Sequence, residues 1–116
     1  MSSNISEDRP WGRFEILKVE NHFKSKVIQV KPQQQISYQS HAKREEHWII
    51  TRGFGVVILN EKEIPVKVGS YIHIPLAAKH RIRNSGTEAL EFVEVQLGTY
   101  FGEDDIVRYA DDYNRK

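Results

Sequence analysis

Short stretches in which apolar and polar residues alternate run along most of the chain. Ile28 and Val30 alternate with Gln29 and Lys31, and residues 88–96 alternate in the same way over a greater length. A period of two is typical of strands with one buried face. Further extended segments are expected at residues 14–19, 26–31, 35–39, 46–51, 54–59, 64–68 and 71–74.

Glycine and proline punctuate these segments at regular intervals, with turns expected at residues 9–12, 60–63 and 69. Eight or more short strands spaced in this way predict an all-β fold, a closed sandwich or jelly roll. The exception is Glu103–Tyr109, where an acidic first turn suits the positive end of a helix and predicts a short C-terminal helical segment. Residues 1–8 are expected to form a polar N-terminal tail, and residues 9–116 a single domain.

Composition excludes several classes of protein. The 116 residues are 39% hydrophobic and 28% charged, with a net charge of +1, which gives no case for nucleic acid or an anionic membrane as a partner. Cysteine is absent, so thiolate metal sites and disulfides are excluded. No apolar stretch approaches the roughly 20 residues of a membrane span, and the polar N-terminus does not resemble a signal peptide. A cytoplasmic protein is expected.

Four polar residues form a candidate metal site. Gln39 and His41 are two residues apart, so on a strand they share one face. Glu46 opens the next apolar segment, and His80 comes from a third. An amide oxygen, a carboxylate and two imidazoles suit Zn, Mn, Fe, Ni or Co. The alternative is that these residues are hydrogen-bonded polar groups inside an empty barrel.

Two spaced patterns frame these residues. The first is His-x4-Glu-x6-Gly from His41, and the second is Gly-x5-Pro-x4-His-x3-Asn from Gly69. Together they resemble the two motifs of the cupin superfamily, whose fold is a double-stranded β-helix barrel of jelly-roll type. Gln33 stands where the first motif usually has glycine, Ala77 where the second does, and Gln39 replaces the first of the usual histidines.

The resemblance extends from about residue 9 to residue 115 and narrows to one family. The strings that carry it are Arg9-Pro-Trp-Gly12, Glu46-His-Trp48, His80-Arg81 with Asn84, Glu94-Val-Gln96, Gly102-Glu-Asp-Asp-Ile-Val-Arg108, Asp111-Asp-Tyr113 and Arg115. They resemble the type II mannose-6-phosphate isomerase domain, which often forms the C-terminal half of enzymes that also carry a mannose-1-phosphate guanylyltransferase. The chain resembles such a domain standing alone.

This resemblance implies a metal-dependent isomerase that interconverts mannose 6-phosphate and fructose 6-phosphate. It implies Gln39, His41, Glu46 and His80 as ligands of a divalent ion, with zinc favoured and Mn, Ni, Co or Fe as alternatives. The ion would stabilise the enediolate that aldose–ketose isomerisation passes through.

The sequence departs from the family at four positions. Ala42 and Lys43 replace two histidines of a common run of three, Lys79 replaces a common proline and His73 a common tyrosine. These departures keep two alternatives open. One is a non-catalytic cupin that binds a sugar or sugar phosphate, and the other is an isomerase or epimerase with an altered substrate. A third, a metal-independent sugar-nucleotide epimerase of jelly-roll type, predicts no bound metal.

The remaining site residues are candidates only. Lys43 and Arg44 lie between ligands in sequence, and Arg108 lies in the shared C-terminal string, so these three are candidates to bind a sugar phosphate. Candidates for the general base are Glu45, His47, Glu103 and Asp104. By resemblance, and because pairing would hide a strand edge, a homodimer is expected.

Overall fold

The computed structural model describes residues 5–111, which form eleven strands and no helix. The strands are β1 (Ile5–Arg9), β2 (Gly12–Val19), β3 (Phe23–Val30), β4 (Tyr38–Ser40), β5 (Arg44–Arg52), β6 (Phe54–Leu59), β7 (Lys62–Lys67), β8 (Tyr71–Ile74), β9 (His80–Arg83), β10 (Leu90–Gly98) and β11 (Val107–Ala110). The expected all-β architecture is confirmed.

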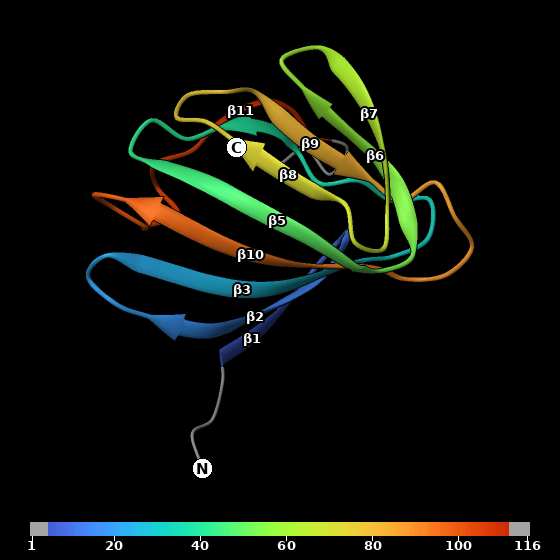
Figure 1. Ribbon diagram of the computed structural model, residues 1–116, viewed down its shortest axis with the longest axis horizontal. Helices are drawn as coiled ribbons and strands as arrows, with labels where there is room; N and C mark the ends of the chain where they lie inside the picture. The colour runs from blue at the N-terminus through green and yellow to red at the C-terminus, as the bar shows by residue number, and fades with distance from the viewer. Residues whose placement is uncertain (1–4, 112–116) are drawn as a thin grey trace.

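The strands form two antiparallel sheets. One sheet has the order β1-β2-β3-β10-β5-β8, and the other has the order β11-β4-β9-β6-β7. Figure 1 shows the first sheet as a broad twisted layer below and the second sheet arching over it. The inner faces of the two layers enclose both the core and the candidate site.

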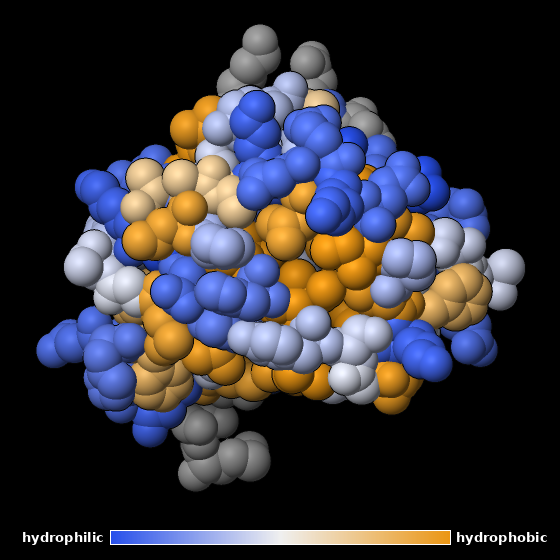
Figure 2. All heavy atoms as spheres, turned by 45° about the horizontal axis from the view of Figure 1, so that its top comes forward, coloured by the Kyte–Doolittle hydropathy of each residue, from blue (hydrophilic) through white to orange (hydrophobic). Residues whose placement is uncertain are grey.

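The core follows from the alternation of side chains along each strand. On β10, Leu90 and Phe92 are fully buried, and on β5 Trp48 and Ile50 are almost so. The second sheet contributes buried apolar residues from β6, β7 and β9, which are Val57, Val66 and Ile82. Figure 2 shows polar and apolar side chains mixed on one outer face of the molecule, with apolar surface visible between the polar groups.

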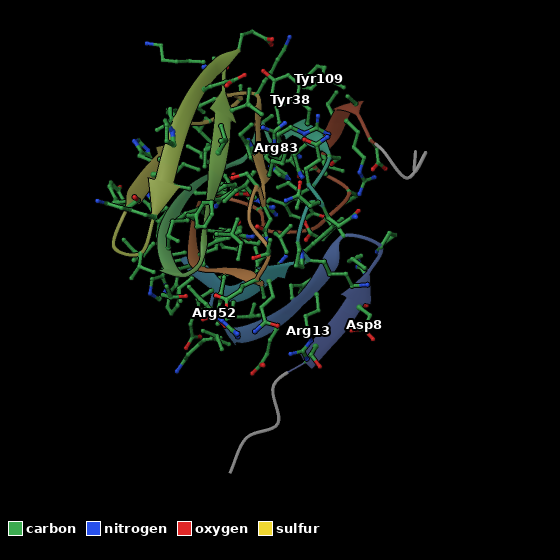
Figure 3. The ribbon with its side chains drawn as sticks, turned by 90° about the vertical axis from the view of Figure 1, so that its right-hand side faces the viewer. Asp8, Arg13, Tyr38, Arg52, Arg83 and Tyr109 are labelled. Carbon is green, nitrogen blue, oxygen red and sulfur yellow. The ribbon has the colours of Figure 1, made fainter. Side chains whose placement is uncertain are left out.

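The predicted C-terminal helix is wrong. Residues 103–105 form a turn, and β11 pairs with β4 at the edge of the second sheet. Figure 3 shows Tyr38 of β4 and Tyr109 of β11 side by side, with ring centroids 6.0 Å apart. Asp105 does not begin a helix; its carboxylate accepts hydrogen bonds from the backbone N–H groups of Ala42 (3.4 Å) and Lys43 (2.9 Å). These tertiary contacts outweigh the weak helix preference of so short a segment.

The first described residues, 5–8, form part of a strand. Residues 5–8 belong to the segment that the sequence analysis assigns to the tail, and in the structure they pair with β2 as part of β1. Along residues 5–111 there is no helix of the length and apolarity that a membrane span requires.

Candidate metal centre

The centre is built around the inward face of β5. Alternation places Arg44, Glu46 and Trp48 on this face, and all three are buried. On the neighbouring strand β10, Glu94 lies opposite Trp48 and Gln96 lies opposite Glu46. Five polar or aromatic side chains therefore meet inside the barrel.

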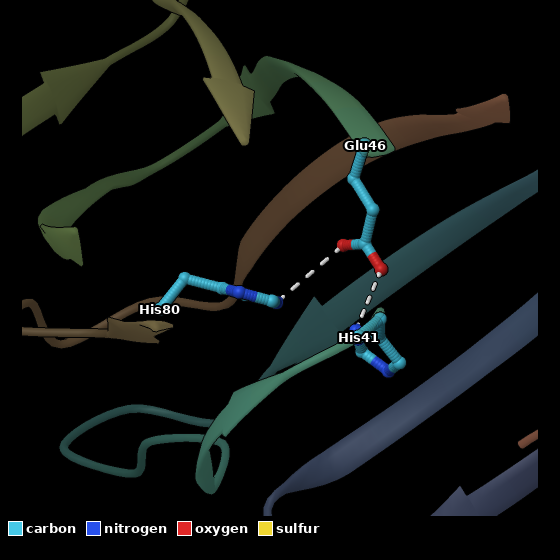
Figure 4. Close-up of side chains that lie close together, drawn as sticks. All are labelled: His41, Glu46 and His80. Atoms are coloured by element: carbon cyan, nitrogen blue, oxygen red, sulfur yellow. Dashed lines mark ion pairs between the residues drawn. The ribbon is translucent and has the colours of Figure 1, made fainter. Parts of the chain in front are cut away.

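The other proposed ligands come from β4, β9 and the residue after β4. Gln39 lies directly opposite His80 in the antiparallel pairing of β4 with β9. His41, Glu46 and His80 are each at most 3% exposed, and each offers a ligand atom within 4.8 Å of the others. Figure 4 shows the carboxylate of Glu46 lying between the two imidazoles. The structure thus brings together the residues that the sequence analysis proposed as ligands.

Both imidazoles are neutral at neutral pH. Burial, reinforced by the charge of Arg44, lowers the pKa of His41 to about 3. Burial also lowers the pKa of His80 to about 4. His41 Nδ1 lies 3.5 Å from Glu46 Oε2, and His80 Nε2 lies 3.7 Å from Glu46 Oε1. Neutral imidazoles beside a carboxylate are the protonation states that metal binding needs.

The donor set fits a divalent ion. His80 Nδ1 lies 3.0 Å from the carbonyl of Ala78, which leaves Nε2 facing Glu46. His41 Nδ1 is buried and has no hydrogen-bond partner. The amide nitrogen of Gln39 donates to Ser37 O (3.3 Å) and Ser37 Oγ (3.2 Å), so the amide oxygen stays available. An unpaired buried nitrogen beside a carboxylate is an arrangement that a cation would complete.

A protein cation also occupies this region. Arg44 Nε donates to Glu46 Oε2 at 2.9 Å, and Arg44 Nη2 lies 3.0 Å from His41 Nε2. A guanidinium has only donors, so His41 Nε2 is the acceptor and Nδ1 carries the proton. A metal ion held by His41 would therefore have to displace this contact. Arg44 and an ion compete for the same two side chains.

The centre opens into a pocket lined by several cations. Arg9, Lys26, Arg44 and Arg108 line it together with Gln39, Glu46, His80, Glu94 and Glu103. Arg108 Nε is buried and has no hydrogen-bond partner. An unpaired buried guanidinium nitrogen is suited to an anionic ligand.

Glu103 and Lys43, which were also proposed as site residues from the sequence, lie in different surroundings. Glu103 accepts from Lys26 Nζ at 2.6 Å and from Arg44 Nη1 at 3.1 Å. Burial raises the pKa of Glu103, but the charges of Lys26 and Arg44 outweigh this and hold it at about 2. Lys43 is exposed, and its Nζ lies 5.3 Å from the centroid of the Tyr100 ring. The structure does not bring Lys43 into the pocket.

Three of the four candidates for the general base also lie elsewhere. Glu45 and His47 project from the outer face of β5 and bond to each other. Asp104 is exposed and accepts a hydrogen bond from the hydroxyl of Tyr100. Only Glu103 lines the pocket, and its low pKa makes it a weak base.

Sequence reasoning missed three buried polar residues, Lys26, Glu94 and Gln96, as parts of the site. Burial, together with the nearby carboxylate of Glu46, raises the pKa of Glu94 to about 8. Its Oε2 accepts from Trp48 Nε1 at 3.2 Å, and its Oε1 accepts from Gln96 Nε2 at 2.7 Å. Alternation along the strands could have identified these residues. Glu94 and Gln96 follow Phe92 at intervals of two residues and so share its buried face, and Lys26 shares the buried face of Ile28 in the same way.

Comparisons with known proteins support the fold and the family. The family model described as "Mannose-6-phosphate isomerase C-terminal" matches residues 2–111. The xanthan biosynthesis protein XanB of Xanthomonas campestris pv. campestris is 42% identical over 92% of this chain and 23% of its own length. The mannose-1-phosphate guanylyltransferase of Salmonella montevideo is 40% identical over 92% of this chain. The chain spans less than a quarter of the length of either relative.

Comparisons with solved structures support the same fold. A conserved protein with a double-stranded β-helix domain from Klebsiella pneumoniae superposes with a TM-score of 0.73, at 21% identity, over 84% of this chain and 83% of that chain. A protein assigned as a sugar phosphate isomerase from Acidithiobacillus ferrooxidans matches 65% of this chain and 50% of its own, with a TM-score of 0.58 and 31% identity. The expected cupin fold is confirmed, and the chain belongs to the family of mannose-6-phosphate isomerase C-terminal domains.

Proposed function

We propose that this chain is a metal-dependent aldose–ketose isomerase that interconverts mannose 6-phosphate and fructose 6-phosphate. The observation that carries the proposal is the buried cluster of His41, Glu46 and His80, which lies with the half-buried Gln39 at a cation-lined pocket. The metal-binding residues of such a pocket suit the carbonyl of an open-chain sugar, and the cationic side chains suit its phosphate group.

The four residues would hold a divalent ion, with Zn²⁺ as the first choice. When bound, the ion would act as a Lewis acid on the oxygens of the sugar's first two carbons. One carboxylate and three neutral donors leave such a centre net positive.

The chain's own residues would bind the phosphate and move the proton. Arg108 and Arg9 line the pocket and are the proposed phosphate ligands; Arg108 Nε is buried without a hydrogen-bond partner, and Arg9 forms an ion pair with Glu7, which lies outside the pocket. Arg44, through its hydrogen bond to Glu103, would tie the C-terminal segment to β5. Lys43 has no part in this scheme, because it is exposed on Tyr100.

Glu94 is the carboxyl best placed to act as the proton carrier. It lines the pocket beside Glu46, and a pKa of about 8 lets it take up and release a proton near neutral pH. In the forward direction it would take the proton from C2 of mannose 6-phosphate and deliver it to C1. The hydroxyl proton on O2 would pass to O1, so that the aldehyde becomes an alcohol and C2 becomes the ketone.

Elemental analysis and a coupled assay test the proposal. Protein dialysed against metal-free buffer is expected to retain about one tightly held equivalent of metal, and Gln39→Ala and His80→Ala are expected to lose it. Fructose 6-phosphate formation from mannose 6-phosphate should fall on chelation and return with Zn²⁺. His22→Ala is the matched control, because His22 is an exposed histidine outside the pocket.

The same experiment separates the alternatives. Metal-loaded protein that binds hexose phosphates saturably but turns none of them over would be a binding cupin. Turnover of another hexose phosphate alone would identify an altered substrate. Protein whose buried centre takes up no metal on reconstitution would be an epimerase-like barrel. The expected homodimer remains a prediction, which light scattering tests directly.

A further inference from the structure

A second cluster of metal-binding side chains lies on the outer face of the first sheet. Glu45 and His47 alternate outward on β5, out of phase with Glu46. His73, on the edge strand β8, lies directly opposite His47 in the antiparallel pairing. Cross-strand neighbours and i, i+2 neighbours share one face, so the backbone itself brings these three side chains together.

The two imidazoles converge on one carboxylate oxygen. His47 Nε2 lies 2.7 Å from Glu45 Oε1, and His73 Nε2 lies 3.2 Å from the same atom. The rings stack with centroids 4.6 Å apart and planes 10° apart. This stacking fixes both Nε2 atoms on the same side of the pair.

Tyr71 also contacts the ring of His47. Its hydroxyl is hydrogen-bonded to His47 Nδ1, and the two rings are stacked. A tyrosine hydroxyl can both donate and accept. It can therefore accept from Nδ1–H when Nε2 binds an ion, as the outer partners of metal-bound histidines do.

The spacing suits a transition-metal ion. Zinc bonds of about 2.0–2.2 Å to nitrogen and oxygen place neighbouring donor atoms roughly 3.0–3.5 Å apart. The separations of 2.7 and 3.2 Å reach this range with a shift of a few tenths of an ångström by the partly exposed Glu45 side chain. His73 is 45% exposed, so water can fill the remaining coordination positions.

We propose that Glu45, His47 and His73 form a surface site for a divalent transition-metal ion, Zn²⁺ or an ion of similar preference such as Cu²⁺ or Ni²⁺. Two imidazoles and a carboxylate favour these ions over Mg²⁺ and Ca²⁺. The site uses no residue of the buried centre, so it does not depend on the proposed isomerase. The two sites lie back to back across β5.

Zn²⁺ titration of the full chain tests this proposal. The variants are His73→Phe, which keeps a stacked ring but has no ligand atom, and Glu45→Gln, which keeps the shape of Glu45. Equilibrium dialysis against free Zn²⁺ should show one equivalent fewer for His73→Phe than for the unaltered chain. Glu45→Gln should weaken the same equivalent at least tenfold.

His22→Ala provides the matched control and should bind as much Zn²⁺ as the unaltered chain. Zn²⁺ bound at the buried centre adds equally to the total measured for every chain. It therefore does not affect the difference between the variants and the unaltered chain. With Cu²⁺, the difference between the electron paramagnetic resonance spectra of the unaltered chain and His73→Phe should show a signal with two nitrogen couplings, which His22→Ala should retain. Equal Zn²⁺ stoichiometry for His73→Phe and the unaltered chain would overturn the proposal, as would an equal loss in His22→Ala.

Discussion

The guanidinium of Arg44 donates to the carboxylate of Glu46 at 2.9 Å, and both side chains are buried on the same face of β5. Arg44 also contacts His41 Nε2. An arginine thus neutralises the carboxylate and contacts the imidazole that an ion would use.

Replacing Arg44 by glutamine should therefore separate folding from metal binding. Breaking a buried ion pair leaves Glu46 uncompensated, so the metal-free variant should lose about 3–5 kcal/mol of unfolding free energy. Its affinity for Zn²⁺ should rise at least tenfold, because a competing cation is gone. Chelator competition and thermal unfolding with and without Zn²⁺ measure both effects.

Arg52→Gln serves as the control, since Arg52 lies exposed at the other end of β5 (Figure 3). It should leave Zn²⁺ affinity unchanged. An Arg44→Gln variant that binds Zn²⁺ no more tightly than the unaltered chain would show that Arg44 does not compete with the ion.

Gln39 should contribute an oxygen to the ion. Its amide nitrogen is occupied by Ser37, so the amide oxygen is the available donor; Gln39→Leu removes this oxygen together with the hydrogen bonds to Ser37 and should weaken Zn²⁺ binding tenfold or more. Gln39→Glu should strengthen it by a similar factor, because a second carboxylate faces the ion. Chelator competition measures both, with Gln29→Leu as a control on the outer face of β3. If Gln39→Leu and the unaltered chain bound Zn²⁺ with equal affinity, Gln39 would not be a ligand, and His41, Glu46 and His80 would remain as the three proposed protein ligands.

Glu94→Gln should reduce kcat by roughly 10²–10⁴-fold. Glutamine keeps the shape of the side chain but cannot carry the proton. Metal content should remain at one equivalent and the melting temperature should not fall, because the change removes a buried ionisable group. The control is Glu91→Gln, on the outer face of the same strand. Retention of kcat in Glu94→Gln would move the proton transfer to another group.

The Glu103 ion pairs should make stability depend on pH in a defined window. The pKa of Glu103 lies at about 2 in the fold against an ordinary 4.5, so its stabilising contribution is complete above about pH 4.5 and is lost as the pH falls towards 2. Its side chain is 51% exposed, so water screens the pairs and the contribution is about 1 kcal/mol or less. Urea unfolding of Glu103→Gln should therefore differ from the unaltered chain at pH 6 and converge with it near pH 2. Glu88→Gln, at an exposed position, should show no such convergence.

Ala77→Gly should stabilise the chain by about 0.5–1 kcal/mol. Ala77 has a φ of 65°, which costs an L-residue roughly 1–2 kcal/mol, and glycine's greater freedom in the unfolded chain offsets part of the gain. Ala77 also donates its backbone N–H to the carbonyl of His41 at 2.7 Å, so the strained turn supports a proposed ligand. Ala89→Gly, at a residue without positive φ, should destabilise instead. Equal shifts in melting temperature for both variants would contradict this account.

The sequence predicted the local part of this architecture well. Alternation located most strands, and the two positions where the motifs usually have glycine, Gln33 and Ala77, both have positive φ. His41 follows the end of β4, so the argument that it shares a strand face with Gln39 does not describe its position. The strands depend on near neighbours in the chain, so a period of two is enough to find them, whereas Gln33 and Ala77 were found through the motif resemblance.

What the sequence could not supply depends on contacts between distant residues. Glu103 looked like a helix start, yet it is held by Lys26, 77 residues earlier, and by Arg44, 59 residues earlier. The burial of Glu94 could have been predicted, because alternation along β10 places its carboxyl on the same face as the buried residues of that strand. Its raised pKa depends first on burial and then on the nearby carboxylate of Glu46, both of which only the folded sheet supplies.

The position of β11 has a consequence for the order in which the molecule is made. This strand pairs only with β4, at the edge of its sheet, and the turn before it supplies Glu103 to Lys26 and Arg44. Residues 103–110 leave the ribosome after every other strand of both sheets. The barrel can therefore form before its pocket has a complete wall. A proteolytic cut just before Glu103 would free that wall from the rest of the chain, and among the described strands β4 alone would lose a pairing partner.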